Sequence, residues 1–208
     1  MFYLVKTPWW LKRYYSTLVW HIPAREKILY LSFDDGPHPV ATPFVLDELK
    51  KYGAKASFFC IGKNVQEYPQ LYKRILSEGH RVGNHTQNHL NGWKVSDNDY
   101  FDNIRQAARY IDSDLFRPPY GRISAFQAAL LQGAPNNFKV IMWDVLSGDF
   151  DRSLTAEKCA RNVKRYSGPG SIIVFHDSEK AFERVQGALP EVLKHFTAMG
   201  YRFDTIRI

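Results

Sequence analysis

Short apolar runs alternate with amphipathic segments from residue 28 onward. Residues 28–33 are apolar almost throughout, which is typical of a strand that is buried on both faces of a parallel sheet. The segment after it places Phe44, Val45 and Leu49 on a helical period, with Thr42 as an N-cap before Pro43 and a stop at Gly53. The same pattern predicts further strands at 56–61, 81–84, 115–117, 140–143, 171–175 and 201–208, and further helices at 69–77, 96–111, 124–132, 155–166 and 183–199.

Strands separated by helices favour parallel strands joined by right-handed crossovers, which close as a barrel or a near-barrel. A chain of 208 residues can bury the core of such an α/β fold as a single domain. We expect residues 28–208 to form that domain and residues 1–27 to form an N-terminal extension.

The N-terminal extension interleaves aromatic and basic side chains. Such interleaving is typical of segments at a membrane surface, although aromatic residues at a terminus also close a core or a dimer contact. A peripheral membrane contact through residues 1–20 and a strap packed on the domain therefore both stay open. The aromatic residues are Phe2, Tyr3, Trp9, Trp10, Tyr14, Tyr15 and Trp20, and the basic residues are Lys6, Lys12, Arg13, Arg25 and Lys27, against the single acid Glu26.

The sequence of this extension fits neither a membrane-spanning helix nor a signal peptide. Lys6, Pro8 and Lys12 interrupt its apolar stretches well before the ~20 residues that a spanning helix needs. The uninterrupted apolar region of a signal peptide is also missing. A cytoplasmic location is the default expectation, and Cys60 and Cys159 are too few for a disulfide framework.

The formal charge of +7 would suit a polyanionic partner. A nucleic-acid binder, however, gathers its basic residues into a stripe or a recognisable module, and here they are dispersed. We therefore expect no nucleic-acid partner.

The polar residues that could carry chemistry follow the predicted strands. Because the carboxyl ends of parallel strands meet at one face, these side chains are expected to converge there. They are Asp34, Asp35, His85, Arg117, Asp149 and His176.

Two histidines separated by three residues, His85 and His89, would form a metal site together with one carboxylate. Two imidazoles and one carboxylate leave a coordination position open to water. Taken singly, the Asp34-Asp35 pair could be a turn, and the two histidines could be a surface pair. A buried strand that ends on two adjacent carboxylates nevertheless favours a cation, because the two charges repel each other and are costly to bury.

Two further groups suit hydrolysis. The prolines of RPPYG at 117–121 stiffen the loop, and Tyr120 carries the first free backbone N–H after them, which could stabilise an oxyanion. Asp149 and His176 could form a pair that raises the histidine pKa and makes it a proton donor. The alternatives are an ordinary loop and a core histidine.

Five motifs in order resemble those of the polysaccharide deacetylases of carbohydrate esterase family four, the NodB homology domain. They are SFDDGP at 32–37, HTQNH at 85–89, RPPYG at 117–121, WDVLSGDF at 143–150 and VFHD at 174–177. The resemblance implies a distorted (β/α) barrel with fewer than eight strand–helix units.

The resemblance also implies roles for single residues. Asp35, His85 and His89 would hold a divalent metal, usually zinc, with cobalt or another divalent ion as alternatives. Asp34 would be the general base that activates water, and His176 would protonate the leaving amine. The remaining roles fall to Arg117, which would orient Asp34, to Asp149, which would tune His176, to Tyr120, whose N–H would stabilise the oxyanion, and to Pro119, Tyr120, Trp143 and Val174, which would line the substrate pocket.

The implied activity is metal-dependent removal of N-acetyl groups from N-acetylglucosamine-containing polymers or oligosaccharides. Two departures from the family pattern, Phe150 in place of a frequent Trp and Val174 in place of a frequent Leu, leave the size of the acyl pocket open. Acetylated xylan, a lipid-linked amino sugar and a small cyclic amide are alternative substrates. A carbohydrate-binding module that has lost turnover is the alternative outside enzymes.

Overall fold

A computed structural model describes residues 3–208; Phe2, counted above among the aromatic residues of the extension, lies outside them. Seven parallel strands follow the order β5-β4-β3-β2-β1-β7-β6, and β8 pairs with the start of β1. The strands are β1 (Ile28–Asp34), β2 (Ala56–Cys60), β3 (Arg81–Asn84), β4 (Leu115–Phe116), β5 (Lys139–Val140), β6 (Val145–Leu146), β7 (Ile172–His176) and β8 (Arg202–Phe203).

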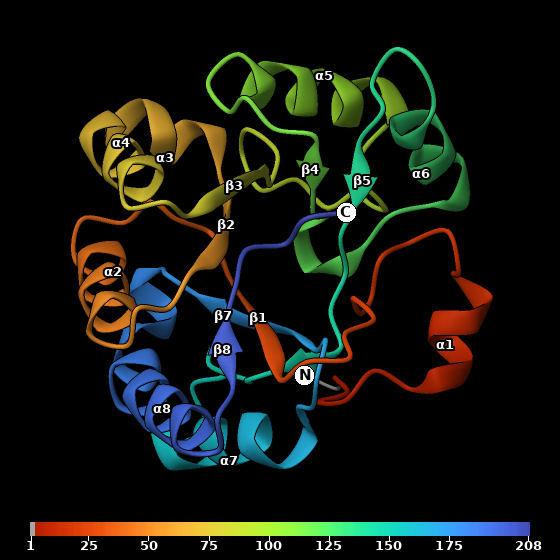
Figure 1. Cartoon of the computed structure of the whole chain (residues 1–208). Helices are drawn as coiled ribbons and strands as arrows, with labels where there is room; N and C mark the ends of the chain where they lie inside the picture. The colour runs from red at the N-terminus through yellow and green to blue at the C-terminus, as the bar shows by residue number, and fades with distance from the viewer. Residues whose placement is uncertain (1–2) are drawn as a thin grey trace.

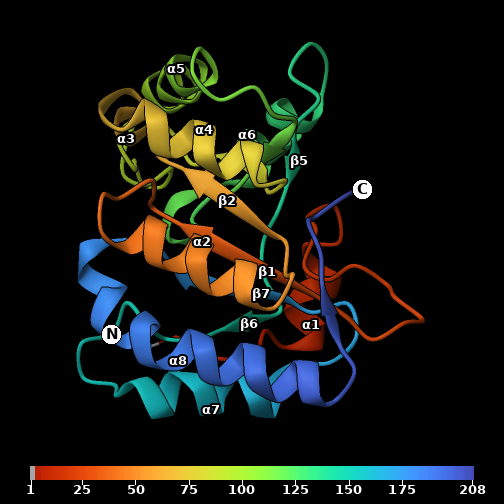
Figure 2. The ribbon, with the colours of Figure 1, turned by 60° about the vertical axis from the view of Figure 1, so that its left-hand side comes forward.

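Helices surround this curled sheet (Figure 1). Figure 2 shows α2, α4 and α8 lying along its outside, with α7 beyond α8. The predicted α/β barrel is thus confirmed. The helices are α1 (Trp9–Tyr14), α2 (Ala41–Lys51), α3 (Gly62–Glu67), α4 (Pro69–Ser77), α5 (Asp97–Ala108), α6 (Ala125–Gln132), α7 (Ala156–Tyr166) and α8 (Glu179–Ala198), with a 3₁₀ turn at Pro119–Gly121.

The central strands are buried because apolar side chains cover both of their faces. Every residue of β1 and β2 is buried. The ring of Phe33 stacks between two neighbours, with centroids 5.1 Å from Phe58 and 6.0 Å from Phe175. Such close packing fixes β1, β2 and β7 against one another and makes a rigid platform for whatever follows them.

The N-terminal segment, residues 3–22, joins the two edge strands of the sheet. Leu146 of β6 donates its backbone N–H to Val5 O at 2.8 Å. Farther along, Val19 donates to Val140 O of β5 at 2.9 Å and accepts from Met142 N at 2.7 Å. In Figure 1, α1 stands in the ring of helices between α6 and α7. The segment therefore closes the barrel where β5 and β6 do not pair with each other.

A buried carboxylate holds this segment in place. Asp144 is only 1% exposed, and it accepts hydrogen bonds from Lys6 Nζ at 2.6 Å, from Ser171 Oγ at 2.5 Å and from Lys12 Nζ. Burial raises the pKa of Asp144, but the hydrogen bonds from Lys12, Lys6 and Ser171 outweigh burial and lower it. The carboxylate thus stays charged between two lysines of the segment.

Some predicted elements differ from the structure. Of the strand expected at 140–143, only Val140 belongs to a strand, β5, because Met142 N donates to Val19 O instead of continuing the sheet, and β6 begins only at Val145. The helix expected after Thr42 begins at Ala41, and the Thr42 hydroxyl instead accepts from His38 N and donates to Asp177. Helices α1 and α3 were not predicted, α8 begins before residue 183, and β8 covers only two residues of the strand expected at 201–208.

Within residues 3–208, none of the helices has the length and hydropathy of a membrane span.

Candidate active site

The predicted site residues gather at the carboxyl ends of the strands. Asp34 ends β1 and His176 ends β7, and the two residues are direct partners in the register of these parallel strands. His85 and Arg117 come directly after β3 and β4. The sheet therefore places the expected base and the expected acid side by side, because equal positions on neighbouring strands lie at the same height.

Asp35, His85 and His89 bring three ligand atoms within 4.8 Å of one another. From Asp35 Oδ1, the Nε2 atom of His89 is 3.2 Å away and that of His85 is 3.6 Å away. The backbone carbonyl of Asp35 accepts from Asn64 Nδ2 at 2.7 Å, which fixes the turn that carries the carboxylate.

These residues fit a divalent cation. Asp35 Oδ1 is buried and has no hydrogen-bond partner among residues 3–208, as expected for an atom that is a metal ligand. His85 Nδ1 lies 2.7 Å from the carbonyl oxygen of Arg117, which can only accept, so the proton sits on Nδ1 and Nε2 is free to be a ligand. Two imidazoles and a carboxylate form a donor set that suits zinc.

The charge states of these ligands also suit a cation. Burial lowers the pKa of His85 to about 4, so this imidazole is neutral at neutral pH. Burial raises the pKa of Asp35, but His89 and the charges of His176 and His85 outweigh burial and bring it below its ordinary value. A neutral imidazole beside an ionised carboxylate is the protonation state that metal binding requires.

Asp34 is held by a buried arginine. Arg117 Nη1 donates to Asp34 Oδ1 at 2.6 Å and to Ser32 Oγ at 2.8 Å. The same guanidinium donates to the carbonyls of Ile141 and Met142 and lies over the ring of Phe59 at 3.9 Å. Arg117 is fully buried and Asp34 is 4% exposed. One carboxylate oxygen is therefore fixed, and the residue can act as a base through the other.

Asp149 holds His176 at two points, the backbone N–H and the ring nitrogen Nδ1. The carboxylate accepts from the His176 backbone N–H at 2.6 Å and from Nδ1 at 2.7 Å. Burial alone lowers the pKa of His176, but the charge of Asp149, its hydrogen bond and the charges of Asp35 and Asp34 raise it to about 10. The raised pKa favours the protonated imidazole, which can donate a proton through Nε2.

Strained backbone is concentrated in this region. Among residues 3–208, five residues other than glycine have positive φ, and four of them lie here: Asp35 (80°), Thr86 (65°), His89 (57°) and Tyr120 (59°). Each costs of order 1–3 kcal/mol, which the surrounding structure must hold in place. The strain indicates that the fold fixes these residues at some cost in stability.

The other expected pocket residues lie around the cluster. The Tyr120 ring is exposed and packs on His89 with centroids 4.6 Å apart, whereas Pro119 is buried. Trp143 is half-buried, and a Cβ added at Gly121 would come within 2.5 Å of its ring, so only glycine fits there. Val174 is buried and pairs in register with Ser32, so its side chain points to the same side as the Ser32 hydroxyl. Whether these four residues contact substrate stays a prediction.

The sequence analysis missed two features beside the site. Asp177 is buried and accepts from Gly36 N at 3.1 Å and from Thr42 Oγ1 at 2.5 Å; burial raises its pKa to about 8. Its place directly after His176 in the last motif was the available signal. The second feature is the contact of Tyr3 with Phe150, for which the sequence holds no signal because the two residues are far apart along the chain.

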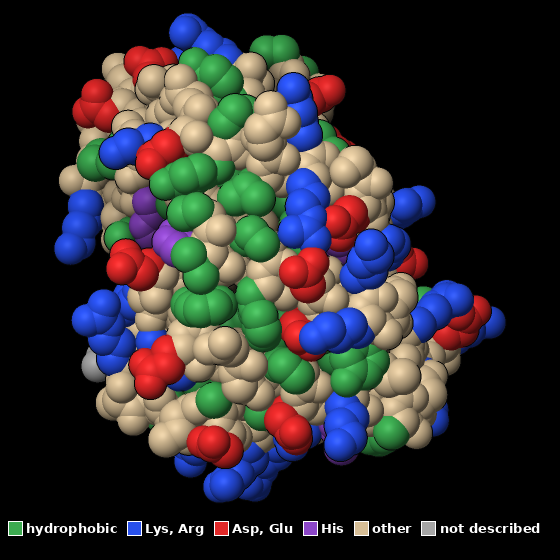
Figure 3. Space-filling view, turned by 90° about the vertical axis from the view of Figure 1, so that its left-hand side faces the viewer, with side chains coloured by type: hydrophobic (Ala, Val, Ile, Leu, Met, Phe, Trp, Pro, Cys, Tyr) green, Lys and Arg blue, Asp and Glu red, His purple; other side chains and the backbone are tan. Residues whose placement is uncertain are grey.

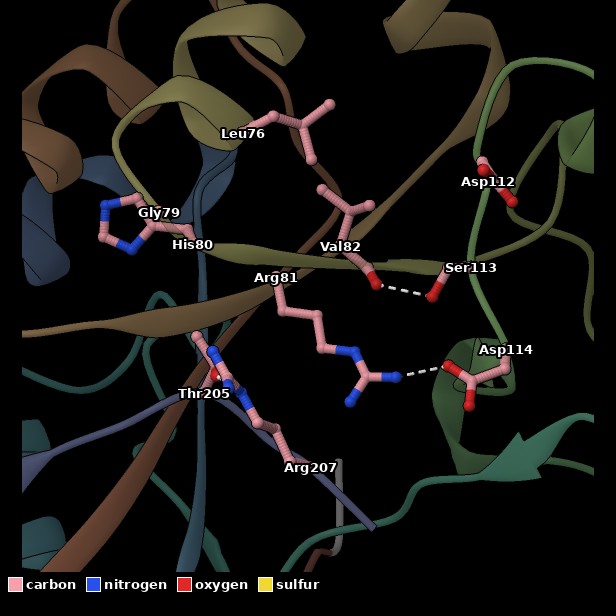
Figure 4. A pocket seen from close by; sticks show the side chains of 10 residues that line it. All are labelled: Leu76, Gly79, His80, Arg81, Val82, Asp112, Ser113, Asp114, Thr205 and Arg207. Atoms are coloured by element: carbon pink, nitrogen blue, oxygen red, sulfur yellow. Dashed lines mark hydrogen bonds and ion pairs between the residues drawn. The ribbon is translucent and has the colours of Figure 1, made fainter.

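A pocket of about 500 Å³ lies at the opposite ends of β3 and β4 (Figure 4). In its lining, Arg81 pairs with Asp114 and the Ser113 hydroxyl donates to the backbone carbonyl of Val82 at 2.7 Å. On the face of the molecule shown in Figure 3, Lys and Arg are scattered among Asp and Glu and do not form a stripe. The cluster at the carboxyl ends of the strands is therefore the site with chemistry.

Comparisons with known proteins agree with this geometry. The family profile described as "Polysaccharide deacetylase" matches residues 21–134. A peptidoglycan-N-acetylglucosamine deacetylase of Bacillus cereus is 35% identical over 91% of this chain and 91% of its own length. The peptidoglycan-N-acetylmuramic acid deacetylase PdaC of Bacillus subtilis is 33% identical over 89% of this chain and 39% of that longer protein.

Solved structures give the same result. The crystal structure of a peptidoglycan N-acetylglucosamine deacetylase in complex with an N-oxidanyl-benzamide superposes with a TM-score of 0.86 at 32% identity, and covers 96% of this chain and 95% of that one. With the five motifs, the strand-end cluster and these matches together, the chain belongs to the polysaccharide deacetylase family.

Proposed function

We propose that the protein hydrolyses the N-acetyl group of N-acetylglucosamine residues in a peptidoglycan-like glycan, releasing acetate and leaving a free amine. One observation carries this proposal: Asp34 and His176 are register partners that flank the Asp35, His85 and His89 cluster. A base and an acid on either side of a cation site are what amide hydrolysis needs. The names of the relatives favour peptidoglycan as the polymer.

We propose that Asp35, His85 and His89 hold a divalent cation, with zinc as the first candidate because the donor set is two imidazole nitrogens and a carboxylate. When bound, such an ion supplies Lewis acidity, which lowers the pKa of a water molecule and polarises the acetyl carbonyl. Cobalt or another divalent ion could use the same donors.

The residues of the chain then move the protons. Asp34, oriented by Arg117, accepts a proton from the attacking water as its oxygen bonds to the acetyl carbon. The backbone N–H of Tyr120 donates to the oxyanion that develops on the carbonyl oxygen. His176 gives its proton to the amide nitrogen as the C–N bond breaks, and Asp149 stabilises the imidazolium until then. The acetyl group leaves as acetic acid, which ionises in solution, and the amine stays on the sugar. The proton taken up by Asp34 passes through solvent to His176, which returns both residues to their starting state.

Two variants of adjacent carboxylates test these roles. Asp34→Asn should lower acetate release from a chitin oligosaccharide by about 10²–10⁴-fold while zinc still binds, because the change removes the base and leaves all three ligands. Asp35→Asn should lower activity and bound zinc together, as measured by elemental analysis. Loss of zinc in Asp34→Asn with retention in Asp35→Asn would contradict the assignment.

The polymer is tested by comparing acetate release from peptidoglycan, chitin oligosaccharides and acetylated xylan with added zinc. We expect release from peptidoglycan and from chitin oligosaccharides, because the relatives named above are deacetylases of N-acetylated peptidoglycan sugars. Release from acetylated xylan alone would contradict the N-acetyl substrate. A chelated control separates catalysis from binding. A protein that binds these glycans but releases no acetate with any divalent metal would be a binding module and not an enzyme.

We also propose a peripheral membrane contact through helix α1. Its Trp9 and Tyr14 are 76% and 77% exposed, Trp10 is 56% exposed, and Arg13 is exposed beside them, while Lys6 and Lys12 pair with Asp144. Exposed aromatic rings beside a cation suit an anionic lipid interface. The double variant Trp9→Ala/Trp10→Ala should lose co-sedimentation with phosphatidylglycerol vesicles, and equal sedimentation would contradict the contact. The cytoplasmic location stays a prediction.

A further inference from the structure

The edge of one aromatic ring touches the proposed acid. Phe150 follows Asp149 directly, and its ring packs on the imidazole of His176 with centroids 5.3 Å apart and ring planes at 73°. His176 is 15% exposed and its Nδ1 side is taken by Asp149. Phe150 therefore forms one wall of the space in which the imidazole can move.

Phe150 is itself held by the N-terminal segment. The ring of Tyr3 packs edge-on against Phe150 with centroids 4.9 Å apart. The Tyr3 hydroxyl donates to Asp151 Oδ2 at 3.1 Å; burial, the hydrogen bond and the negative charge of Asp151 raise the pKa of this tyrosine, so it stays a donor. Tyr3 thus contacts two consecutive residues of this loop, Phe150 through its ring and Asp151 through its hydroxyl.

The loop that carries Asp149 is shaped around Tyr3. A Cβ added at Gly148 would lie 3.0 Å from the Tyr3 hydroxyl oxygen and 2.8 Å from Leu154 Cδ1, and Gly148 has a φ of +86°. Two residues along the segment, Val5 accepts the backbone N–H of Leu146 at 2.8 Å, which fixes the segment on β6. The contact between Tyr3 and Phe150 is therefore anchored from both sides.

We propose that Tyr3 is a positioning residue for the proton donor: it holds Phe150 and the 148–151 loop, and through them the imidazole of His176. This inference rests on the proposed deacetylase function and adds a residue from outside the five motifs. Removing the Tyr3 ring opens space behind Phe150, which lets both rings reorient. The proton on Nε2 is then aimed less often at the leaving nitrogen.

The chemistry of the leaving group gives this role a specific signature. In amide hydrolysis the nitrogen leaves as an amine only after it receives the proton of His176, whereas 4-nitrophenolate leaves an acetate ester as a stable anion and needs none. A misplaced His176 should therefore slow hydrolysis of the amide and leave hydrolysis of the ester unchanged. A defect in the cation site or in Asp34 should appear with both, because both substrates need water attack.

The experiment compares Tyr3→Ala with Tyr3→Phe, and with Tyr110→Ala as a matched control at an exposed tyrosine outside the site. With zinc and a chitin oligosaccharide we expect Tyr3→Ala to lower kcat by about tenfold with KM within about twofold, a part of the full contribution of a general acid. With 4-nitrophenyl acetate we expect kcat within about twofold of wild type. Tyr3→Phe should recover most of the amide activity, and Tyr110→Ala should match wild type.

A second variant, at Phe150, tests the same role without changing Tyr3. Phe150→Leu should reproduce the selective loss of amide hydrolysis, and the double variant Tyr3→Ala/Phe150→Leu should lose little more than either alone, because both changes act on one contact. This variant decides the matter if Tyr3→Ala does not fold, which a thermal melt of each protein reveals.

Equal losses with amide and ester, or full amide activity in Tyr3→Ala and Phe150→Leu, would overturn the role of Tyr3 and leave the proposed function standing. A wild-type protein that releases no acetate from the oligosaccharide with any divalent metal would instead overturn the proposed function, and this role with it.

Discussion

At the scale of single residues, the site depends on charges that are buried in pairs. Arg117 is fully buried, and among residues 3–208 Asp34 alone balances its positive charge at hydrogen-bond distance. A buried pair of this kind contributes little net stability, but removing one partner leaves a charge without water or a counter-ion. The arrangement makes the orientation of Asp34 sensitive to any change at Arg117.

Arg117→Met should therefore lower the free energy of unfolding by about 3–5 kcal/mol, measured by urea denaturation, and should lower activity with it. The matched control is Arg105→Met, because Arg105 pairs with Asp102 on the exposed surface, and such pairs are worth about 1 kcal/mol or less. An Arg117→Met protein as stable as wild type would show that Asp34 does not need this partner.

The pKa of His176 predicts the alkaline side of the pH profile. Activity should fall as the pH rises through this pKa, because the neutral imidazole has no proton to give. Asp149 raises the pKa toward about 10, and a cation at the neighbouring site lowers it by repelling the proton. Asp149→Asn should move the alkaline limb of kcat/KM to lower pH by about one unit or more, since the charge that favours the imidazolium is gone. An unmoved limb would assign it to another group.

Single residues were predictable from sequence where a motif fixes them. Asp34 and His176 end strands, and His85 and Arg117 come directly after strands, so their convergence was predictable from the parallel sheet. The contact of Tyr3 with Phe150 could not be predicted, because nothing in the local pattern near residue 3 tells which loop lies beside it. Long-range contacts of this kind depend on the packed fold and not on local sequence.

At the scale of elements, the N-terminal segment acts as an additional edge of the sheet. Its backbone bonds to β6 at Val5 and to β5 at Val19, and Asp144 receives both lysines. The segment covers strand edges whose free N–H and C=O groups would otherwise be open to pairing with other chains. It is a structural part of the barrel as well as a carrier of exposed aromatic rings.

Asp144→Asn should loosen this segment. We expect the free energy of unfolding to fall by roughly 1–3 kcal/mol, because a buried charge-assisted network loses its acceptor. Limited proteolysis followed by mass spectrometry should show faster cleavage within residues 3–22. Asp47→Asn serves as the control, because Asp47 meets Arg74 on the surface. Unchanged cleavage within the segment would mean that backbone pairing alone holds it.

Element boundaries were predicted well where a local signal ends them. Helix α4 lies as predicted between Pro69 and the stop at Gly79, and strand β3 lies as predicted at Arg81–Asn84. The strand expected at 140–143 failed because its partner is the N-terminal segment, and the apolar pattern does not tell one partner from another. Helix α3 was missed because six residues are too few to show a helical period.

At the scale of the whole molecule, the hydrophobic core and the candidate metal site occupy different parts of the sheet. The stacked rings of Phe33, Phe58 and Phe175 lie within the strands, whereas the three candidate metal ligands come after strand ends. The fold class followed from the strand–helix alternation, since parallel strands need crossovers. How the barrel closes did not follow, because closure uses residues from outside the alternating pattern.

Removing the metal should therefore stop catalysis without unfolding the chain. With a chelator we expect loss of acetate release, an unchanged circular dichroism spectrum at 25 °C and a lower Tm. Zinc at 100 times its Kd should return about 2.7 kcal/mol of stability by mass action. A chelated protein that loses its tertiary spectrum at 25 °C would show that the ion is part of the core.

The closure of the barrel by residues 3–22 also has a consequence for the order in which a nascent chain folds. Lys6 meets Asp144, a partner 138 positions farther along the sequence. On a ribosome, the closing segment emerges first and must wait while the strands that it joins are made. Because contacts between distant residues form slowly, we expect this segment, which is translated before the strands that it joins, to dock after them.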